Sequence, residues 1–326
     1  MPRQPCQNAA AAARFIVLRR FEMKIATTTG DFQYFCNSYE DRIRELHRAG
    51  FRYIDLSMYH LAPDSPLMQD DWREYTLKLK ALADELGMTF VQAHSPGGNL
   101  LWQDEARVEY LVKSTIRSIE VCGVLGIKNT VVHPGARRDI GKEEWFALNK
   151  PLYEKLFPAM ERCGVNVLCE NSSEQNTGKG CYYLYTGQDM REFIDYVGHP
   201  QFGGCWDTGH ANMVGPQYES ILAVGDKLWA IHYNDNRGER DDHIMPFMGS
   251  LNHDEVMHAL IDVGFGGYFT LECCDELRWY GARRHFGDEN TTLKLKNPTL
   301  AMQRHIAAML YDTAKWIVES YDLFEE

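Results

Sequence analysis

The chain has 326 residues, of which 44% are hydrophobic, and its 46 acidic and 34 basic residues give a formal net charge of −12. This length and composition suffice for one large α/β domain or two ordinary ones. The acidic balance argues against a nucleic-acid-binding protein, because such binding depends on clustered Lys and Arg. The nine cysteines lack paired metal or redox spacing, so we expect a reducing, cytoplasmic setting. No apolar run reaches the roughly 20 residues that span a bilayer, so we expect no membrane association.

Residues 1–22 differ from the rest of the chain. Residues 9–13 are all alanine, and Arg14, Arg19 and Arg20 interrupt the apolar residues that follow. Such an interrupted segment does not fit a secretory signal. We interpret residues 1–22 as an N-terminal extension outside the domain, or as an accessory helix. We expect a single domain over residues 23–326.

Strand-like and helix-like patterns alternate eight times after this segment. The expected strands, rich in β-branched and aromatic residues, are residues 24–28, 52–56, 88–93, 129–132, 165–169, 202–206, 228–232 and 268–271. The expected helices, several of which stop at a glycine, are residues 39–49, 72–86, 105–125, 142–163, 189–197, 218–224, 254–263 and 300–320.

Eight β-then-α units predict an α/β fold of the (β/α)8 TIM-barrel type. The doubly wound alternative lacks support, because no Gly-x-Gly-x-x-Gly follows the first strand. A long loop at residues 273–297 follows the last strand. It fits a lid, a subunit contact or a solvated loop equally well.

Metal-capable side chains follow most of the later strands. They are His94, His133, Glu170, Asp207, His210, His232 and Glu272, with Asp241 and His243 in the loop after the seventh strand. One such histidine is more often structural, and one such acid often caps a helix. Their recurrence in register favours a shared site, because the functional site of a TIM barrel lies at these strand ends.

Three of the acids would meet at the mouth of the barrel. No Lys or Arg stands at a neighbouring strand end to pair with Glu170, Asp207 and Glu272. Unpaired buried charges are costly, and a divalent cation removes the repulsion. Asp207 with His210 three residues later also offers the oxygen and nitrogen donors that such cations accept. His60, after the second strand, is a further candidate to line the site. Trp206, Trp102 and Phe35 are candidates to cover a substrate ring, although core packing explains each of them equally well.

Several of these segments resemble the sugar phosphate isomerase/epimerase family, whose barrel is xylose-isomerase-like. The resemblance covers roughly residues 23–272 and includes ketose 3-epimerases, inosose isomerases and dehydratases, and apurinic-site endonucleases. It rests on D-T-G-H-A-N at 207–212, H-P-G at 133–135, E-N at 170–171, His232 with D-N at 235–236, D-D-H at 241–243 and L-E at 271–272.

The resemblance implies a metal centre. In the epimerase branch one Mn²⁺, Co²⁺ or Mg²⁺ would be held by Glu170, Asp207, His232 and Glu272. The endonuclease branch holds three zinc ions and adds His94, His133, His210, Asp241 and His243. All nine positions are filled in this chain, so the number of ligands leaves the branch open. We expect one divalent ion, Mn²⁺ before Co²⁺, Mg²⁺ or Zn²⁺.

The chain departs from the family at three places. Residues 246–249 read Pro-Phe-Met-Gly where members often have Pro-Gly-x-Gly. Asn176 stands where ketose epimerases carry a substrate-contacting Glu, and their Arg falls on Gly238, beside Arg237. These differences weigh against a simple free-ketohexose epimerase.

The expected function is a sugar or polyol isomerase or epimerase. The metal would act as a Lewis acid and stabilise an enediolate, with Glu170 and Glu272 as base and acid. The remaining family positions and Arg237 would contact the substrate. The alternatives are a lyase on the same site (an inosose-type dehydratase or a deglycosidase of an oxidised glycoside), a zinc-dependent apurinic-site endonuclease, and a non-catalytic barrel. We expect a small sugar or polyol as the partner, no nucleic acid, and assembly as a homo-oligomer.

Overall fold

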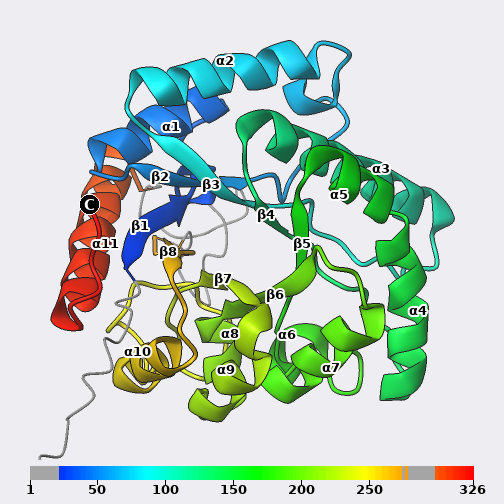
Figure 1. Cartoon of the computed structure of the whole chain (residues 1–326). Helices are drawn as coiled ribbons and strands as arrows, with labels where there is room; N and C mark the ends of the chain where they lie inside the picture. The colour runs from blue at the N-terminus through cyan, green and yellow to red at the C-terminus, as the bar shows by residue number, and fades with distance from the viewer. Residues whose placement is uncertain (1–21, 274–275, 278–297) are drawn as a thin grey trace, which may run out of the picture.

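Eight parallel strands form one sheet in the order β7-β6-β5-β4-β3-β2-β1-β8 (Figure 1). The computed structural model describes residues 22–273, 276–277 and 298–326. The strands are β1 Met23–Thr28, β2 Tyr53–Ser57, β3 Thr89–His94, β4 Asn129–Val131, β5 Asn166–Glu170, β6 Phe202–Asp207, β7 Leu228–His232 and β8 Gly267–Leu271.

The two ends of the sheet meet between β7 and β8. Tyr233, the residue after β7, forms a parallel bridge with Leu271. The amide of Tyr233 donates to the carbonyl of Thr270 at 2.7 Å, and the amide of Glu272 donates to the carbonyl of Tyr233 at 3.1 Å. These bonds join β7 to β8 at the carboxyl-end rim. The (β/α)8 barrel expected from the sequence is therefore confirmed.

Helices surround the strands (Figure 1). The described α-helices are α1 Tyr39–Arg48, α2 Trp72–Glu85, α3 Glu105–Leu125, α4 Lys142–Glu154, α5 Phe157–Cys163, α6 Glu174–Thr177, α7 Gly187–Val197, α8 Thr208–Asn212, α9 Tyr218–Val224, α10 His253–Asp262 and α11 Leu300–Ser320. Three short 3-10 helices are η1 Thr29–Phe32, η2 Pro66–Met68 and η3 Gly225–Lys227.

One expected helix is wrong in extent. Residues 142–163 form two helices, α4 and α5, instead of one. Pro158, in the first turn of α5, has no N–H with which to continue the bonding of α4 to the carbonyl of Glu154. The short helices α6 and α8, which lie in the loops after β5 and β6, were not expected from the sequence.

The strands are buried on both faces, as a covered parallel sheet requires. Inside the barrel, Val131, Leu168, Cys205 and Ala230 pack as one small apolar cluster. The main core lies between the strands and the surrounding helices and includes Phe202, Trp206 and Phe269. The polar strand ends lie at the carboxyl-end rim of the barrel, next to this inner cluster, and form the floor of the site.

Two expected regions lie almost wholly outside the described residues. They are the N-terminal extension at residues 1–22, of which only Glu22 is described, and the loop at residues 273–297, of which Cys273, Glu276 and Leu277 are described. In the part of the chain that is described, no helix combines the length and apolarity needed to cross a membrane.

Candidate active site

The carboxyl ends of the strands open into a cavity of about 490 Å³. Its lining comprises Thr28, Gly30, Gln33, Tyr34, Ser57, Tyr59, His60, His94, His133, Glu170, Ser172, Asn176, Thr177, His210, Asp241, His243 and Glu272. None of these described lining residues is a Lys or Arg. The carboxylates of the cavity therefore meet imidazoles as their main charge partners.

Glu170, at the end of β5, lies between two histidines. Its Oε1 is 2.5 Å from Nδ1 of His232, and its Oε2 is 2.5 Å from Nε2 of His133. Nε2 of His94 lies 3.2 Å from Nε2 of His133. Two ring nitrogens that face each other so closely cannot both carry protons. This arrangement suits nitrogens directed at one shared cation.

A second group of donors surrounds His232. Its Nδ1 lies 3.2 Å from Oε2 of Glu272. The candidate ligand atoms of Glu170, Asp207, His232 and Glu272 all lie within 4.8 Å of one another. The four residues end or follow β5, β6, β7 and β8, so consecutive strand ends build the group. The prediction that they share one centre is consistent with this geometry.

Asp207 is held in place by its neighbours. Its Oδ1 accepts a hydrogen bond from the amide of His210 at 2.6 Å and so caps α8. Its Oδ2 accepts from Nδ2 of Asn234 at 2.7 Å, and its own amide donates to Oδ1 of Asn171 at 2.7 Å. These bonds fix the carboxylate rotamer, which a metal ligand needs.

A third group lies on the opposite side of the cavity floor. Nε2 of His210 and Nε2 of His243 are each 3.1 Å from Oδ2 of Asp241. Nδ1 of His210 lies 2.9 Å from the carbonyl of Asn171, which directs Nε2 towards Asp241. Asn176, at the position where the sequence departs from the ketose epimerases, donates to the same Asp241 oxygen at 2.8 Å.

The two glutamates have opposite electrostatic settings. Burial acts to raise the pKa of Glu170, but His232 and His133 hold that pKa well below its ordinary value. Burial raises the pKa of Glu272 to about 7, against the opposing effect of His232 and His243. Near neutral pH, one carboxyl group is therefore ionised while the other is close to half protonated.

The pKa values of two histidines, His94 and His210, are also shifted in opposite directions. Burial, reinforced by His133, lowers the pKa of His94 to about 3. Burial also acts to lower the pKa of His210, but Asp207 and Asp241 raise it to about 10. His94 is therefore neutral at pH 7, while His210 balances part of the negative charge around Asp241.

The donor set fits a divalent cation. Three groups, in each of which the ligand atoms lie within 4.8 Å of one another, contain all nine predicted residues: His94, His133 and Glu170; Glu170, Asp207, His232 and Glu272; and His210, Asp241 and His243. A fourth group, Glu170, Cys205 and His232, adds a buried cysteine. Mixed carboxylate and imidazole donors suit Mn²⁺, Co²⁺ or Zn²⁺. The nine strand-end residues predicted from the sequence are thus brought together.

The other predicted residues are placed differently. His60 lines the cavity. Arg237 lies outside the cavity lining and pairs with Asp242, Nη1 to Oδ2 at 3.2 Å. Trp206 is only 1% exposed and belongs to the main core, so it does not cover a substrate. Phe35 is half-buried against the same core, and Trp102 lines a neighbouring cavity.

Some residues of the site were not expected. Tyr59 stands beside His94 and His133, with ring centroids 5.2 Å and 6.2 Å away. Asp55 on β2 is only 1% exposed, and its Oδ2 lies 3.7 Å from Nε2 of His232. The sequence did contain a signal for Asp55, because this residue is an acid inside a strand that was expected to be apolar. The sequence offered no comparable signal for Tyr59.

The fold and the rim of carboxylates and imidazoles define an α/β barrel with a candidate metal centre. The family described as xylose isomerase-like TIM barrel matches residues 43–292, and the chain belongs to this family. This confirms the fold and family expected from the sequence.

Two curated relatives illustrate the range of the family. The chain is 25% identical over 178 residues to an inosose isomerase of Bacillus velezensis, which covers 52% of this chain and 62% of the relative. It is 30% identical over 130 residues to a probable endonuclease 4 of Citrifermentans bemidjiense, which covers 36% of this chain and 44% of the relative. The matches therefore span about half the length of these relatives.

Solved structures share the fold. The IOLI protein with a binding zinc atom is 19% identical, with 93% of this chain and 100% of that chain covered at a TM-score of 0.67. The 3-keto-D-glucoside 4-epimerase YcjR from E. coli is 17% identical, with 91% and 100% covered at a TM-score of 0.66. At these identities the likeness concerns the fold alone.

Proposed function

We propose that this protein is a divalent-metal-dependent isomerase or epimerase of a sugar or polyol. The observation that carries the proposal is the pair Glu170 and Glu272, whose carboxylate oxygens lie 2.5 Å and 3.2 Å from the same atom, Nδ1 of His232, within one candidate metal-ligand group. Two carboxyl groups beside one Lewis-acidic site form an acid–base pair suited to proton transfer at carbon.

The two glutamates would divide the proton transfer between them. Glu170, ionised at neutral pH, removes the proton from the carbon beside the substrate carbonyl. Glu272, the second carboxylate of the group, returns one. Return to the other face of that carbon gives epimerisation, and return to the neighbouring carbon gives isomerisation.

The metal would be held by the group that includes both glutamates, with Asp207 and His232 completing it. A bound divalent cation supplies Lewis acidity that stabilises negative charge developing on the substrate oxygens. His94 and His210 lie on opposite sides of the cavity and are suited to bind substrate hydroxyls. We propose Mn²⁺ as the physiological ion, to be checked by metal analysis of the purified protein.

The comparisons support this class of reaction. The inosose isomerase and the 3-keto-D-glucoside 4-epimerase named above both rearrange a cyclic polyol or sugar, according to their names. The cavity of about 490 Å³ also falls within the range of small-molecule sites.

Solvent deuterium tests the proposal. The metal-loaded protein, incubated in D₂O with a panel of ketoses, inososes and 3-keto-glycosides, should incorporate deuterium beside the carbonyl of a substrate. Glu170→Gln should lower the exchange rate by at least about 100-fold, because general acid–base catalysis contributes that much. Glu174→Gln, a nearby change on α6 outside the cavity lining, is the control. Full exchange by the Glu170 variant would refute the assigned role, and elimination of water or an aglycone after exchange would indicate a lyase.

A second candidate function is a three-zinc apurinic-site endonuclease. The observation in its favour is that all three donor groups are complete, together with the endonuclease 4 relative. The net charge of −12 argues against DNA binding, because contacts to the phosphate backbone depend on Lys and Arg. Three zinc ions per chain and cleavage of a duplex with one abasic site would establish this function. One ion per chain and an intact duplex would exclude it.

A further inference from the structure

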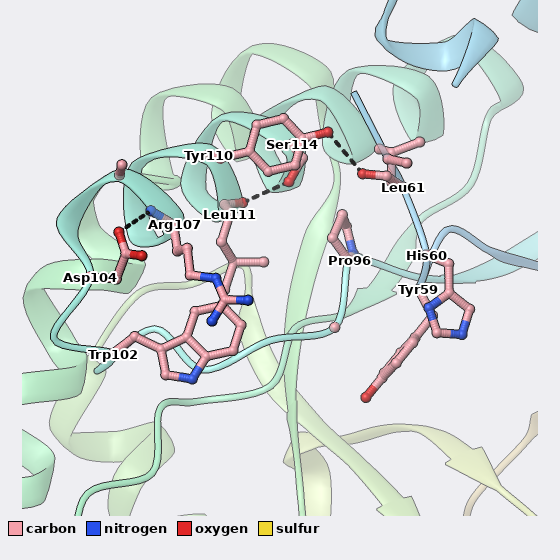
Figure 2. A pocket seen from close by; sticks show the side chains of 13 residues that line it. Tyr59, His60, Leu61, Pro96, Trp102, Asp104, Arg107, Tyr110, Leu111 and Ser114 are labelled. Atoms are coloured by element: carbon pink, nitrogen blue, oxygen red, sulfur yellow. Dashed lines mark hydrogen bonds between the residues drawn. The ribbon is translucent and has the colours of Figure 1, made fainter. Parts of the chain in front are cut away.

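A second cavity, of about 540 Å³, adjoins the candidate active site. It lies between the loop after β2, the loop after β3 and the first turns of α3, and Tyr59 and His60 line both cavities. Figure 2 shows Tyr59 and His60 on one side, Trp102 and Arg107 on the other, and Pro96 between them. The two cavities therefore share a wall, and a molecule that reaches over Tyr59 from the active site would enter the second cavity.

Tyr59 forms the wall shared by the two cavities. Its ring packs against Gly97, where an added Cβ would lie 2.2 Å from the ring, and the Gly97 amide donates to the Tyr59 carbonyl at 3.0 Å. The ring also meets His94 edge-on at 5.2 Å. Tyr59 is nevertheless 40% exposed. Contacts on both sides hold this aromatic wall, yet it presents surface to a ligand.

Trp102 and Arg107 form the opposite wall. The guanidinium carbon of Arg107 lies 5.0 Å from the centroid of the Trp102 ring, and Trp102 is 39% exposed. No described carboxylate forms an ion pair with Arg107. An indole covered by a planar guanidinium offers a stacking surface for a further ring. The hydrogen bond from the Tyr110 hydroxyl to the Leu61 carbonyl, at 2.9 Å, closes the back of the cavity.

The same cavity disfavours an anion. Asp104 lines it and caps α3 by accepting from the amide of Arg107 at 3.1 Å. Its carboxylate occupies the position at the helix N-terminus that a phosphate would otherwise take. The remaining lining is mainly apolar and aromatic, as in sites that accept an uncharged ring.

From this geometry we infer that the substrate is a glycoside that carries a keto group on its sugar ring, and whose aglycone ring lies between Tyr59 and the Trp102–Arg107 pair. The inference rests on the proposed function for the sugar half, which occupies the cavity with the glutamates. The place proposed for the aglycone rests on the second cavity, its aromatic walls and the two residues that it shares with the first cavity. An aromatic or otherwise flat, uncharged ring is the class of group that these walls accept.

Equilibrium binding tests the inference without requiring turnover. Isothermal titration of the metal-loaded protein would compare phenyl and methyl β-D-glucopyranoside, and the same pair of β-D-galactopyranosides. We expect the phenyl glycoside of at least one sugar to bind about tenfold more tightly than its methyl counterpart, as one stacked ring contributes. Equal affinities for every pair, or no binding of any probe, would overturn the inference.

Substitutions in the second cavity would show whether its walls cause the preference for the phenyl glycoside. Trp102→Ala should reduce the phenyl-to-methyl ratio to within about threefold, because the stacking surface is lost. Trp316→Ala on α11, a change of another exposed tryptophan (60% exposed) far from this cavity's lining, should retain the full ratio. Arg107→Gln, which keeps much of the side-chain length, should reduce the ratio as well and serves if Trp102→Ala does not fold. A ratio unchanged in both cavity variants would overturn the inference.

The two proposals can fail separately. A phenyl preference that depends on Trp102, without deuterium exchange into any substrate, would reject the proposed reaction and keep the second cavity as a ring-binding site. Deuterium exchange without a Trp102-dependent preference would keep the reaction and reject the glycoside.

Discussion

At the residue scale, one buried acid, Asp55, lies directly beneath the rim and close to His232. Asp55 projects into the barrel from β2, and neither of its carboxylate oxygens has a hydrogen bond among the described residues. Its Oδ2 is 3.7 Å from Nε2 of His232, while Nδ1 of the same ring faces Glu170 at 2.5 Å. At 3.7 Å the contact is electrostatic, without a hydrogen bond, and it favours a proton on Nε2, which leaves Nδ1 to face the candidate metal site.

This contact predicts an effect on metal affinity. Asp55→Leu should weaken binding of Mn²⁺ or Zn²⁺ by about 10–100-fold, because the carboxylate that orients His232 is removed. Competition with a chelating dye would measure the change. Gln92→Met is the control, since Gln92 is buried in the barrel interior but bonds to Thr270 instead of a proposed ligand. Equal affinities of the Asp55 variant and the parent protein would contradict the prediction.

At the element scale, the helices that follow β5 and β6 pack unusually closely. Gly187 is the first residue of α7, and a Cβ at this position would lie 1.7 Å from the carbonyl oxygen of Ser220 on α9. Because that atom belongs to the backbone, the two helices would have to move apart to admit a side chain. Glycine here sets how closely α7 and α9 approach each other.

Gly187→Ala should therefore reduce the free energy of unfolding by about 1–3 kcal/mol, as overpacking of a core does. Urea denaturation followed by circular dichroism would measure it. Gly141→Ala is a matched control: Gly141 precedes α4, has a negative φ of −82°, and has no atom within 4 Å of an added Cβ. Gly141 is also the N-cap of α4, so the control should lose only about 0.5–1 kcal/mol, because alanine is a poorer N-cap than glycine. Similar losses in both variants would contradict the close-packing explanation.

At the scale of the whole molecule, metal binding, protonation and folding are linked. In the metal-free protein the pKa of Glu272 is about 7 and that of His210 is about 10. Metal ligands must be deprotonated, so binding at either residue displaces its proton. Lowering the pH keeps these protons in place and opposes binding.

The apparent metal affinity should accordingly fall as the pH decreases from 8 to 6, by about tenfold per pH unit for each proton displaced. Titration of Mn²⁺ at pH 6, 7 and 8, in buffers of different ionisation enthalpy, would measure the affinity and the number of protons released. Saturating metal should also stabilise the fold, by about 2.7 kcal/mol at 100 times the dissociation constant. An affinity that does not vary with pH would contradict the linkage.

Much of the barrel and its rim was predictable because the signals are local. The glycines after the third, fourth and fifth long helical stretches do adopt the left-handed conformation that ends a helix, with φ of 82° at Gly126, 64° at Gly164 and 71° at Gly198. Likewise, an apolar strand that ends in a polar residue is visible in a few consecutive positions, as at Glu170. Pro158 was also a local signal, and the single helix expected over residues 142–163 overlooked it.

The alternation of strands and helices, the family and the nine candidate site residues could therefore be predicted from the sequence. The contacts among those residues, the position of Asp55 behind His232 and the wall that Tyr59 forms between two cavities could not, because they join residues that are far apart along the chain. Strand ends and helix stops depend on neighbouring residues, whereas His232 meets Asp55 only when a barrel brings β7 and β2 to opposite sides of one interior.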